Sequence, residues 1–353
     1  MQFKKKILVA PLNWGLGHAT RCIPIIEALE NHGYEPVIAS NGAALSLLKK
    51  EFPLLTAVEL PDYQIEYAKK GAFFKIKHLM QMPRMFTSVY NENKIVCDLV
   101  KEYGLSGIIS DNRLGAFCKS VPSVFITHQL NVLTGNTTGL TSGIHTFFVN
   151  RYRECWVPDV AGNPNLSGKL GHIEGDAPNL KYIGPISRLH KKAVQKRYDL
   201  MVLLSGQEPQ RSLLEEKLIS ELSGYDGRVI FIRGVIEATE KVTQQGAVTF
   251  YNFMNTTDLE QAFNESEMVV CRPGYTNIMD LAKLCKKAFF IPTPQQYEQE
   301  YLAKKLKRSG IAPYATQKGF KITDLAKTEM YKGLKNIECT IKWKDLFCLF
   351  EGK

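Results

Sequence analysis

The chain has 353 residues, of which 44% are hydrophobic, so it is long enough for two domains with substantial cores. Its formal net charge of +10 suits nucleotides, nucleic acid or an acidic membrane surface, although plain solubility explains it equally well. No apolar run reaches the roughly 18 residues of a membrane span. The short apolar run after the N-terminal lysines leads into a glycine-rich turn, unlike a secretory signal.

The cysteines argue against a metal centre or a disulfide framework. All eight are scattered along the chain, without a C-x-x-C pair and without a cysteine–histidine cluster at zinc spacing. We therefore expect reduced, mostly buried thiols, as in cytoplasmic proteins, and no bound metal.

Short β-rich apolar runs alternate with helical patterns in the first half of the chain. We expect buried parallel strands at 7–11, 36–40, 56–60, 107–111 and 123–127. The helix after the first run should have Pro24 near its first turn and end around Gly33, a residue suited to a C-terminal cap. This rhythm is typical of a doubly wound sheet.

A second such series follows the basic segment 181–199, which we interpret as a linker. Its expected strands lie at 199–205, 228–233, 248–252, 268–272 and 287–293. The sequence therefore predicts an α/β protein with two doubly wound, Rossmann-like domains, 1–185 and 186–353, that face a cleft. In such folds ligands bind where strands end and helices begin.

A glycine-rich turn ending in a histidine follows the first strand. In GLGHAT, which contains Gly15, Gly17 and His18, Thr20 replaces the third glycine of a dinucleotide fingerprint, and the second strand ends without a carboxylate. NAD is therefore not expected. The turn brings backbone N–H groups close to a ligand and sets His18 at the mouth of the cleft, where an imidazole suits a general base. Alternatively, His18 only caps the helix or binds a backbone carbonyl.

Two more polar residues of this half follow strands. Asp111 ends the run 107–111 and could hold the far nitrogen of His18, which would select the useful tautomer. The alternative for Asp111 is an N-cap of the next helix. His128, in THQLN, is also expected to face the cleft, with ordinary loop polarity as the alternative.

The stretch VVCRPGYTNIMDLA is the most informative part of the second half. Arg272 and Gly274 lie in a turn, and a helix is expected to start near Asn277. Free N–H groups at that helix start, with Arg272 beside them, suit a diphosphate. Asp280 could accept hydrogen bonds from both hydroxyls of a ribose. Alternatively, it caps the helix with Asn277, because the two have the spacing of a capping box.

Two further loops of this half carry polar candidates. The loop after the strand at 199–205 could line the phosphates with Ser205, Gly206 and Gln207. The helix after the strand at 287–293 begins with Glu298, Gln299 and Glu300. We expect its first turn to point into the cleft, where carboxylates and amides suit the hydroxyls of a sugar.

These motifs lie between residues 7 and 305, and their order along the chain resembles that of the GT-B glycosyltransferases. The resemblance is strongest to family 28, which includes the lipid-II-forming N-acetylglucosaminyltransferase of peptidoglycan synthesis. GLGHAT resembles the N-terminal loop of the family, and LLSGQEPQ loosely resembles its second loop, G-G-S-Q-G. THQLN resembles T-H-E-Q-N, with Gln129 and Leu130 at its altered centre. CRPGYTNIMD resembles R-S-G-x-x-T-x-x-E, with Asp280 at the ribose-binding position, and Gln299 and Glu300 fall in the sugar-binding segment.

The resemblance implies that the C-terminal domain binds a UDP-sugar, the N-terminal domain binds the acceptor, and the last helix crosses back to the N-terminal domain. It implies inverting, metal-independent transfer in which His18, paired with Asp111, takes the proton of an acceptor hydroxyl. The absence of D-x-D agrees with this. Donor contacts are expected from Ser205, Gly206, Gln207, Arg272, Gly274, Tyr275, Thr276, Asp280, Gln299 and Glu300. Acceptor contacts are expected from Gly15, Gly17, His128 and Asn131.

The departures from the family motifs leave the sugar open, either a hexose or an N-acetylhexosamine, and they leave open whether the acceptor is lipid-linked or another glycan. The basic, aromatic segment 67–86 suggests a lipid acceptor or an anionic membrane surface; alternatively, it is a core helix with a solvated basic side. We expect a cytoplasmic, peripheral enzyme without a cofactor or a nucleic-acid partner. The alternatives are a UDP-sugar 2-epimerase on the same fold and a non-catalytic nucleotide- or glycan-binding module.

Overall fold

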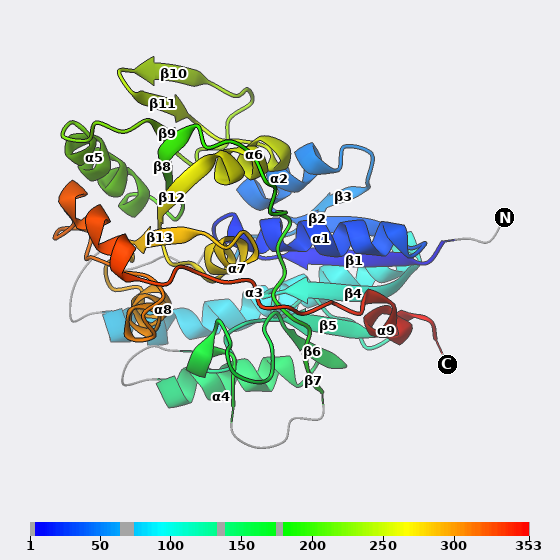
Figure 1. Ribbon diagram of the computed structural model, residues 1–353. Helices are drawn as coiled ribbons and strands as arrows, with labels where there is room; N and C mark the ends of the chain where they lie inside the picture. Colours follow the sequence, from blue (N-terminus) through cyan, green and yellow to red (C-terminus); the bar gives the residue numbers. More distant parts are fainter. Residues whose placement is uncertain (1–3, 64–73, 133–137, 174–178, 353) are drawn as a thin grey trace.

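The computed structural model describes residues 4–63, 74–132, 138–173 and 179–352, and only the backbone of 74–84, 138–142 and 144 (Figure 1). The segment 67–86, for which we predicted a lipid or membrane contact, therefore lies almost wholly outside the described side chains. No helix of the described ranges is both long and apolar enough to pass through a membrane.

The first half of the chain forms a seven-stranded parallel sheet in the order β3-β2-β1-β4-β5-β6-β7. The strands are β1 (Lys6–Pro11), β2 (Glu35–Ser40), β3 (Ala57–Glu59), β4 (Leu105–Asp111), β5 (Ser123–Ile126), β6 (Glu154–Val157) and β7 (Leu180–Tyr182). The helices are α1 (Gly17–Asn31), α2 (Gly42–Glu51), α3 (Phe74–Tyr103) and α4 (Thr138–Val149). The five predicted strands are confirmed, whereas β6 and β7 were not predicted.

The second half forms a six-stranded sheet in the order β10-β11-β9-β8-β12-β13. Its strands are β8 (Tyr198–Leu203), β9 (Val229–Ile232), β10 (Val242–Gln245), β11 (Val248–Tyr251), β12 (Ser266–Cys271) and β13 (Lys287–Phe290). Its helices are α5 (Gln210–Leu222), α6 (Thr256–Glu265), α7 (Tyr275–Lys283) and α8 (Tyr297–Arg308). All pairs are parallel except β10 with β11, which is antiparallel. Strand β11 lies at the predicted strand 248–252, whereas the exposed β10 was not predicted.

Helix α1 shows how the local sequence sets an element. It ends as predicted, because Gly33 adopts a φ of +83°, in the left-handed region that favours glycine. Pro24, however, lies inside the helix and not near its first turn. The difference arises because α1 already begins at Gly17, directly after the glycine-rich turn. Its apolar face, which includes Cys22, Ile26 and Leu29, is buried against the first sheet.

The end of the chain returns to the first sheet (Figure 1). Helix α9 (Trp343–Phe347) and the following 3-10 turn place Phe347 beside Tyr34 and Trp156, with ring centroids 5.7 and 6.5 Å away. A Cβ at Gly107 of β4 would lie 2.2 Å from the Phe350 ring, so only glycine leaves room for this packing. The last strand of the first sheet ends at residue 182 and the first of the second begins at 198. The division of the chain at 185 stays a prediction.

The expectation that all cysteines are free is wrong for one pair. Cys97 of α3 and Cys118, which lies before β5, form a disulfide with Cα atoms 5.3 Å apart. The two are 21 residues apart, and the packing of α3 on the sheet brings them together, which no local spacing signals. Of the six remaining thiols, three are buried and three are exposed.

Candidate active site

The register of the first sheet collects the polar ends of three strands. Pro11 of β1 pairs with Asp111 of β4, which pairs in turn with Ile126 of β5. Because the strands are parallel, the turn that carries His18, the side chain of Asp111 and the loop with His128 all meet at the same edge of the sheet. Helices α7 and α8 of the second half contact this edge through Thr276 and Glu298.

His18 and Asp111 are in contact, as predicted from the sequence. The Nδ1 of His18 lies 2.8 Å from Oδ1 of Asp111, and the guanidinium of Arg21 donates to both carboxylate oxygens. Neither alternative reading holds, because α1 has no side-chain cap and no helix starts between Asp111 and β5. A proton on Nδ1, donated to Asp111, leaves the lone pair of Nε2 free to accept a proton.

The charge of Asp111 is stable in this environment. Burial of its side chain raises the pKa of Asp111, but the charges and hydrogen bonds of Arg21 and His18 have the larger effect. Together they lower the pKa from 3.8 to about 2. Asp111 is therefore ionised at neutral pH and can stabilise a positive charge that develops on His18. The neighbouring thiol of Cys22 stays protonated, because burial, together with the charge of Asp111, raises its pKa.

His128 is held by three different partners and is not an ordinary polar loop residue. Its Nδ1 lies 3.1 Å from Nη1 of Arg21, and its Nε2 lies 2.9 Å from Oε1 of Glu298. Its ring also stacks on that of Tyr275, with centroids 4.4 Å apart. The amide nitrogen of Gln129 lies 3.5 Å from Nε2 of His128 but donates to Oε2 of Glu298 instead. Burial lowers the pKa of His128, although Glu298 opposes the shift.

Glu298 is a cleft residue that was not among the predicted contacts. Its side chain accepts hydrogen bonds from His128 and, at 2.6 Å, from Gln129, both in the first half of the chain. Glu300, which was predicted to contact the donor, instead accepts from the backbone of Gln295 and lies 3.9 Å from Lys304. The structure does not bring Glu300 into the cleft, because residues two apart point to opposite sides of a helix.

The beginning of α8 explains this choice between the two carboxylates. Gln296 is the N-cap, and its side chain accepts from the backbone N–H of Gln299. The side chain of Gln299 turns back and accepts from the backbone of Thr293 at 2.8 Å, so it orders the turn before the helix. The N-cap fixes the helical register, and this register points Glu298 at His128. In the sequence, Gln296 as the N-cap was the signal that could have singled out Glu298.

The predicted glycines and Thr276 lie where the two halves touch. Gly15 has a φ of +74°, and a Cβ at Gly17 would lie 3.0 Å from the hydroxyl oxygen of Thr276. That hydroxyl donates to the carbonyl of Gly17 at 3.1 Å. The missing side chain at Gly17 therefore allows α7 to approach the first turn of α1. Asn131, by contrast, donates to the carbonyls of Lys169 and His172 and ties the loop after β5 to the segment 168–172.

Helix α7 begins at Tyr275, two residues before the predicted start, and has Gly274 as its N-cap without a side-chain bond. The N–H groups of its first turn are thus left to other acceptors. The predicted capping box is wrong, because Asn277 donates to the carbonyl of Arg272 at 3.0 Å and Asp280 accepts from Ser187 at 2.6 Å. The hydroxyl of Tyr275 reaches across and donates to the carbonyl of Pro158 in the first half.

Arg272 is buried without a carboxylate partner in the described part of the chain. Its guanidinium donates to the carbonyls of Ile291 and Gln210 and to the side chain of Gln317. Burial lowers its pKa to about 10. The three contacts connect the loop after β12 with the end of β13, with the segment after α8, and with the start of α5, at the end of the loop after β8. The loop after β8 holds the exposed residues Gly206, with a φ of +109°, and Gln207, and the half-buried Ser205.

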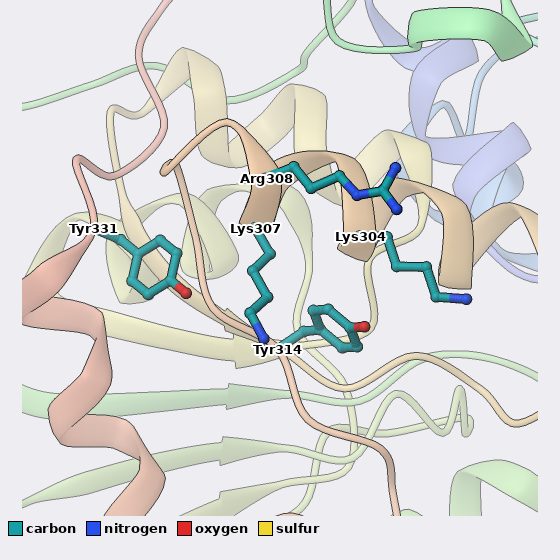
Figure 2. Close-up of a pocket in the computed structure, with 5 residues that line it drawn as sticks. All are labelled: Lys304, Lys307, Arg308, Tyr314 and Tyr331. Carbon is teal, nitrogen blue, oxygen red and sulfur yellow. The ribbon is translucent and has the colours of Figure 1, made fainter.

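Two further observations concern possible metal and ligand sites. The described residues contain no group of three or more histidine, cysteine, aspartate or glutamate side chains placed to hold a metal ion. A pocket of about 420 Å³ lies at the last turn of α8 and is lined by Lys304, Lys307, Arg308, Tyr314 and Tyr331 (Figure 2). It shares no residue with the contacts that join Glu298, in the first turn of α8, to His128 and Gln129.

Comparison with known proteins agrees with this geometry. Residues 209–338 match the glycosyltransferase family 28 C-terminal domain. The chain is 25% identical over 337 residues, 91% of this chain and 88% of the relative, to the UDP-N-acetylglucosamine–N-acetylmuramyl-(pentapeptide) pyrophosphoryl-undecaprenol N-acetylglucosamine transferase of Haemophilus ducreyi. It is 21% identical to an uncharacterized glycosyltransferase of Methanopyrus kandleri, over 80% of this chain and 84% of that one.

Solved structures share the fold. MurG of Acinetobacter baumannii superposes with a TM-score of 0.57 at 14% identity, covering 99% of both chains. The glycosyltransferase SnogD of Streptomyces nogalater superposes with a TM-score of 0.61 at 13% identity, covering 92% of this chain and 91% of its own. The predicted GT-B fold is confirmed.

The buried carboxyl of Asp280 makes stability depend on pH. Burial raises its pKa from 3.8 to about 6, so this group favours folding below pH 4 and the benefit is lost as the pH rises through 6. Asp280→Asn should therefore gain stability relative to wild type with rising pH, by up to about 3 kcal/mol at pH 8. Urea unfolding between pH 4 and pH 8 measures this. The exposed Asp226→Asn is the control, and a difference for Asp280→Asn that does not change with pH would contradict the assignment.

Proposed function

Because the chain is a glycosyltransferase of the GT-B fold with a family-28 C-terminal domain, we propose that it transfers a hexose or N-acetylhexosamine from a UDP-sugar to a hydroxyl of a lipid-linked or other glycan acceptor. The observation that carries the proposal is the buried pair of Asp111 and His18 at the sheet edge, opposite the open helix start of α7. An oriented base faces an anion-binding helix end, which is what sugar transfer from a diphosphate requires.

In the proposed reaction, Nε2 of His18 takes the proton of the acceptor hydroxyl. The acceptor oxygen forms a bond to the anomeric carbon while the bond from that carbon to the diphosphate oxygen breaks. The electron pair leaves with UDP, so the anomeric configuration inverts in this single displacement. Asp111 remains ionised throughout and stabilises the imidazolium through Nδ1.

The donor would lie along the second half of the chain. The first-turn N–H groups of α7, after Gly274, would accept the diphosphate charge without a metal ion. Asp280, one turn further on and with a pKa of about 6, would be mostly ionised at neutral pH and would accept from the ribose hydroxyls. Glu298 at the start of α8 would bind hydroxyls of the sugar, because its carboxylate already lies beside His128 and Gln129.

Arg272 would support the donor site indirectly, through the segments that surround it. Its present hydrogen bonds are all to the loops that surround the start of α7. The charge is buried and has no carboxylate partner among the described residues, so an anionic diphosphate nearby would compensate it. We infer that Arg272 orders these loops and adds positive potential, while the N–H groups make the direct contacts.

An aromatic patch in the first half supports a membrane location. We define it as Phe86, Tyr90 and Phe147, which are 41%, 72% and 53% exposed. The guanidinium of Arg151 lies over the Phe147 ring, 4.6 Å from its centroid. Large apolar side chains beside a cation are typical of proteins that rest on an anionic membrane surface. We propose peripheral binding there, on the cytoplasmic face, with no role for nucleic acid.

Donor binding tests the proposed function. One UDP-sugar from a panel of UDP, UDP-glucose, UDP-galactose, UDP-N-acetylglucosamine, GDP-mannose, dTDP-glucose and NAD should bind selectively in calorimetry. Asp280→Ala should lose this binding, while the exposed Asp226→Ala should keep it. Failure of every nucleotide to bind would reject the transferase. An epimerised UDP-sugar without release of UDP, seen by NMR, would favour the epimerase instead.

Flotation with liposomes tests the membrane proposal separately. The full chain should float with vesicles that contain anionic phospholipid and should stay behind with purely zwitterionic ones. Replacing two members of the aromatic patch, Phe147→Ser and Tyr90→Ser, should reduce the floating fraction. Leu54→Ser, at a side chain that is 97% exposed and outside the patch, is the matched control. No binding to anionic vesicles by a protein active on a soluble acceptor would exclude the membrane role.

A further inference from the structure

We propose that Arg21 is a positioning residue that orients two imidazoles, those of His18 and His128, from a single guanidinium, and thereby links the base to Glu298 on the donor side of the cleft. The inference rests on the proposed function, in which His18 is the base. It assigns to Arg21 a role that neither the motifs nor the predicted contacts gave it.

Each of the three guanidinium nitrogens of Arg21 has a hydrogen-bond partner. Arg21 lies three residues after His18 on α1, so both side chains are on one face of the helix. Its Nε and Nη2 donate to the two oxygens of Asp111, and Nη2 is also 2.8 Å from Nδ1 of His18. Its Nη1 is 3.1 Å from Nδ1 of His128. The side chain is almost fully buried, so water does not replace these partners.

The chemistry of the guanidinium fixes the tautomer of His128. A guanidinium only donates hydrogen bonds, so Nδ1 of His128 must be the acceptor and carries no proton. The single proton of the neutral ring is then on Nε2, from which it is donated to Oε1 of Glu298 at 2.9 Å. Only this neutral tautomer satisfies both partners. His128 is therefore a fixed donor toward the carboxylate that we propose for sugar binding.

His18 differs from His128, because its Nδ1 lies 2.8 Å both from a donor, Nη2 of Arg21, and from an acceptor, Oδ1 of Asp111. We infer that Nδ1 carries the proton, because Nη2 already donates to Asp111 and only the carboxylate can accept a proton from Nδ1. Because Arg21 grips both oxygens of Asp111, Oδ1 stays directed at His18. The forked grip of a guanidinium holds a carboxylate in one orientation, which a single ammonium group does not. Arg21 thus acts on the base by fixing the residue that orients it.

The surrounding charges keep His128 neutral. Its ring is faced by the charged or titratable groups of Arg21, Glu298, His18, His145 and Tyr275, while Asp111 and Cys22 lie on the far side of Arg21. Burial lowers the pKa of His128, Glu298 opposes this, and Arg21 and His18 lower it further. Loss of the guanidinium therefore leaves a histidine next to Glu298 that protonates more readily.

An exclusively structural ion pair would not need this arrangement. Two nitrogens of Arg21 suffice to neutralise Asp111, yet the third reaches His128 in the loop after β5. The contacts then continue to Glu298 at the start of α8, in the other half of the chain. A change in what Glu298 binds therefore reaches His128 directly and Asp111 through Arg21.

Histidine tautomers test the role of Arg21 without any substrate. Long-range ¹H–¹⁵N NMR spectra of the histidine-labelled full chain, with His128 assigned by His128→Asn, would be recorded from about pH 5.5 to about pH 8.5. In wild type, Nδ1 of His128 should show the shift of an unprotonated nitrogen throughout. In Arg21→Met, His128 should become protonated within this range. Arg21→Lys, which keeps the charge and is the safer variant for folding, should change its tautomer mixture.

Kinetics give the second readout. Arg21→Lys should lower kcat on the order of 100-fold and change the KM for the UDP-sugar by less than about threefold, because orientation is lost while donor contacts remain. Arg113→Lys, at an equally buried arginine that pairs with Glu92, is the matched control and should leave the His128 signals unchanged. A wild-type His128 with its proton on Nδ1, or an Arg21→Lys variant with wild-type tautomers and kcat, would overturn the proposal.

The two readouts separate this proposal from the proposed function. The NMR signals depend only on the folded protein, so a chain with the expected tautomers that transfers no sugar would count against the transferase alone. A chain that transfers sugar while its His128 signals ignore Arg21 would count against the role of Arg21 alone.

Discussion

A buried carboxylate at the end of β4 organises the candidate active site. Asp111 is inaccessible to water, and an isolated charge there would be strongly unfavourable. Arg21 compensates it, and this requires α1 to begin just where it does, so that His18 and Arg21 stand three residues apart on the same face. The glycine-rich turn before α1 provides that start. The orientation of His18, the position of His128 and the contact with α8 all depend on this one ion pair.

The two halves of the chain meet at the site through a small number of specific contacts. The Thr276 hydroxyl bonds to the carbonyl of Gly17, and the rings of His128 and Tyr275 stack. Glu298 completes the set with hydrogen bonds to His128. Each contact joins a strand-end loop of the first half to a helix start of the second. The candidate base is thereby held beside the helix ends to which we assign the donor, so its reach toward the anomeric carbon depends on the relative position of the halves.

Much of the fold could be predicted from the sequence because buried parallel strands are written as continuous apolar runs. The runs around β1, β4 and β12 are examples, and Gly33 marked the end of α1 correctly. Strands β6 and β7 were missed because neither has a long continuous apolar run: β7 has Lys181 at its centre, and β6 begins with Glu154. The Cys97–Cys118 disulfide was missed since it depends on how α3 packs, and not on a local spacing.

In the candidate site, too, some residues could be predicted from the sequence and others could not. His18 and Asp111 could be paired from the sequence, because both follow parallel strands and such ends meet at one edge. Glu298 could not be separated from Glu300 without the helical register that Gln296 sets as N-cap. Arg21 could not be recognised at all. Its function depends on His18 on the same helix, on Asp111 of β4 and on His128 after β5, and an arginine on a helix is ordinarily an exposed surface residue.

The most direct test of the central claim replaces Asp111 by asparagine and compares sugar transfer with donor binding. Asparagine keeps the size of the side chain but loses the charge, and its amide NH2 can donate to Nδ1 of His18 and so favour the other tautomer. We predict UDP-sugar affinity close to that of wild type and a transfer rate that falls by roughly 10⁴-fold, as for a catalytic histidine whose orienting carboxylate becomes an amide. A variant that binds the donor and still transfers sugar at the wild-type rate would contradict the account.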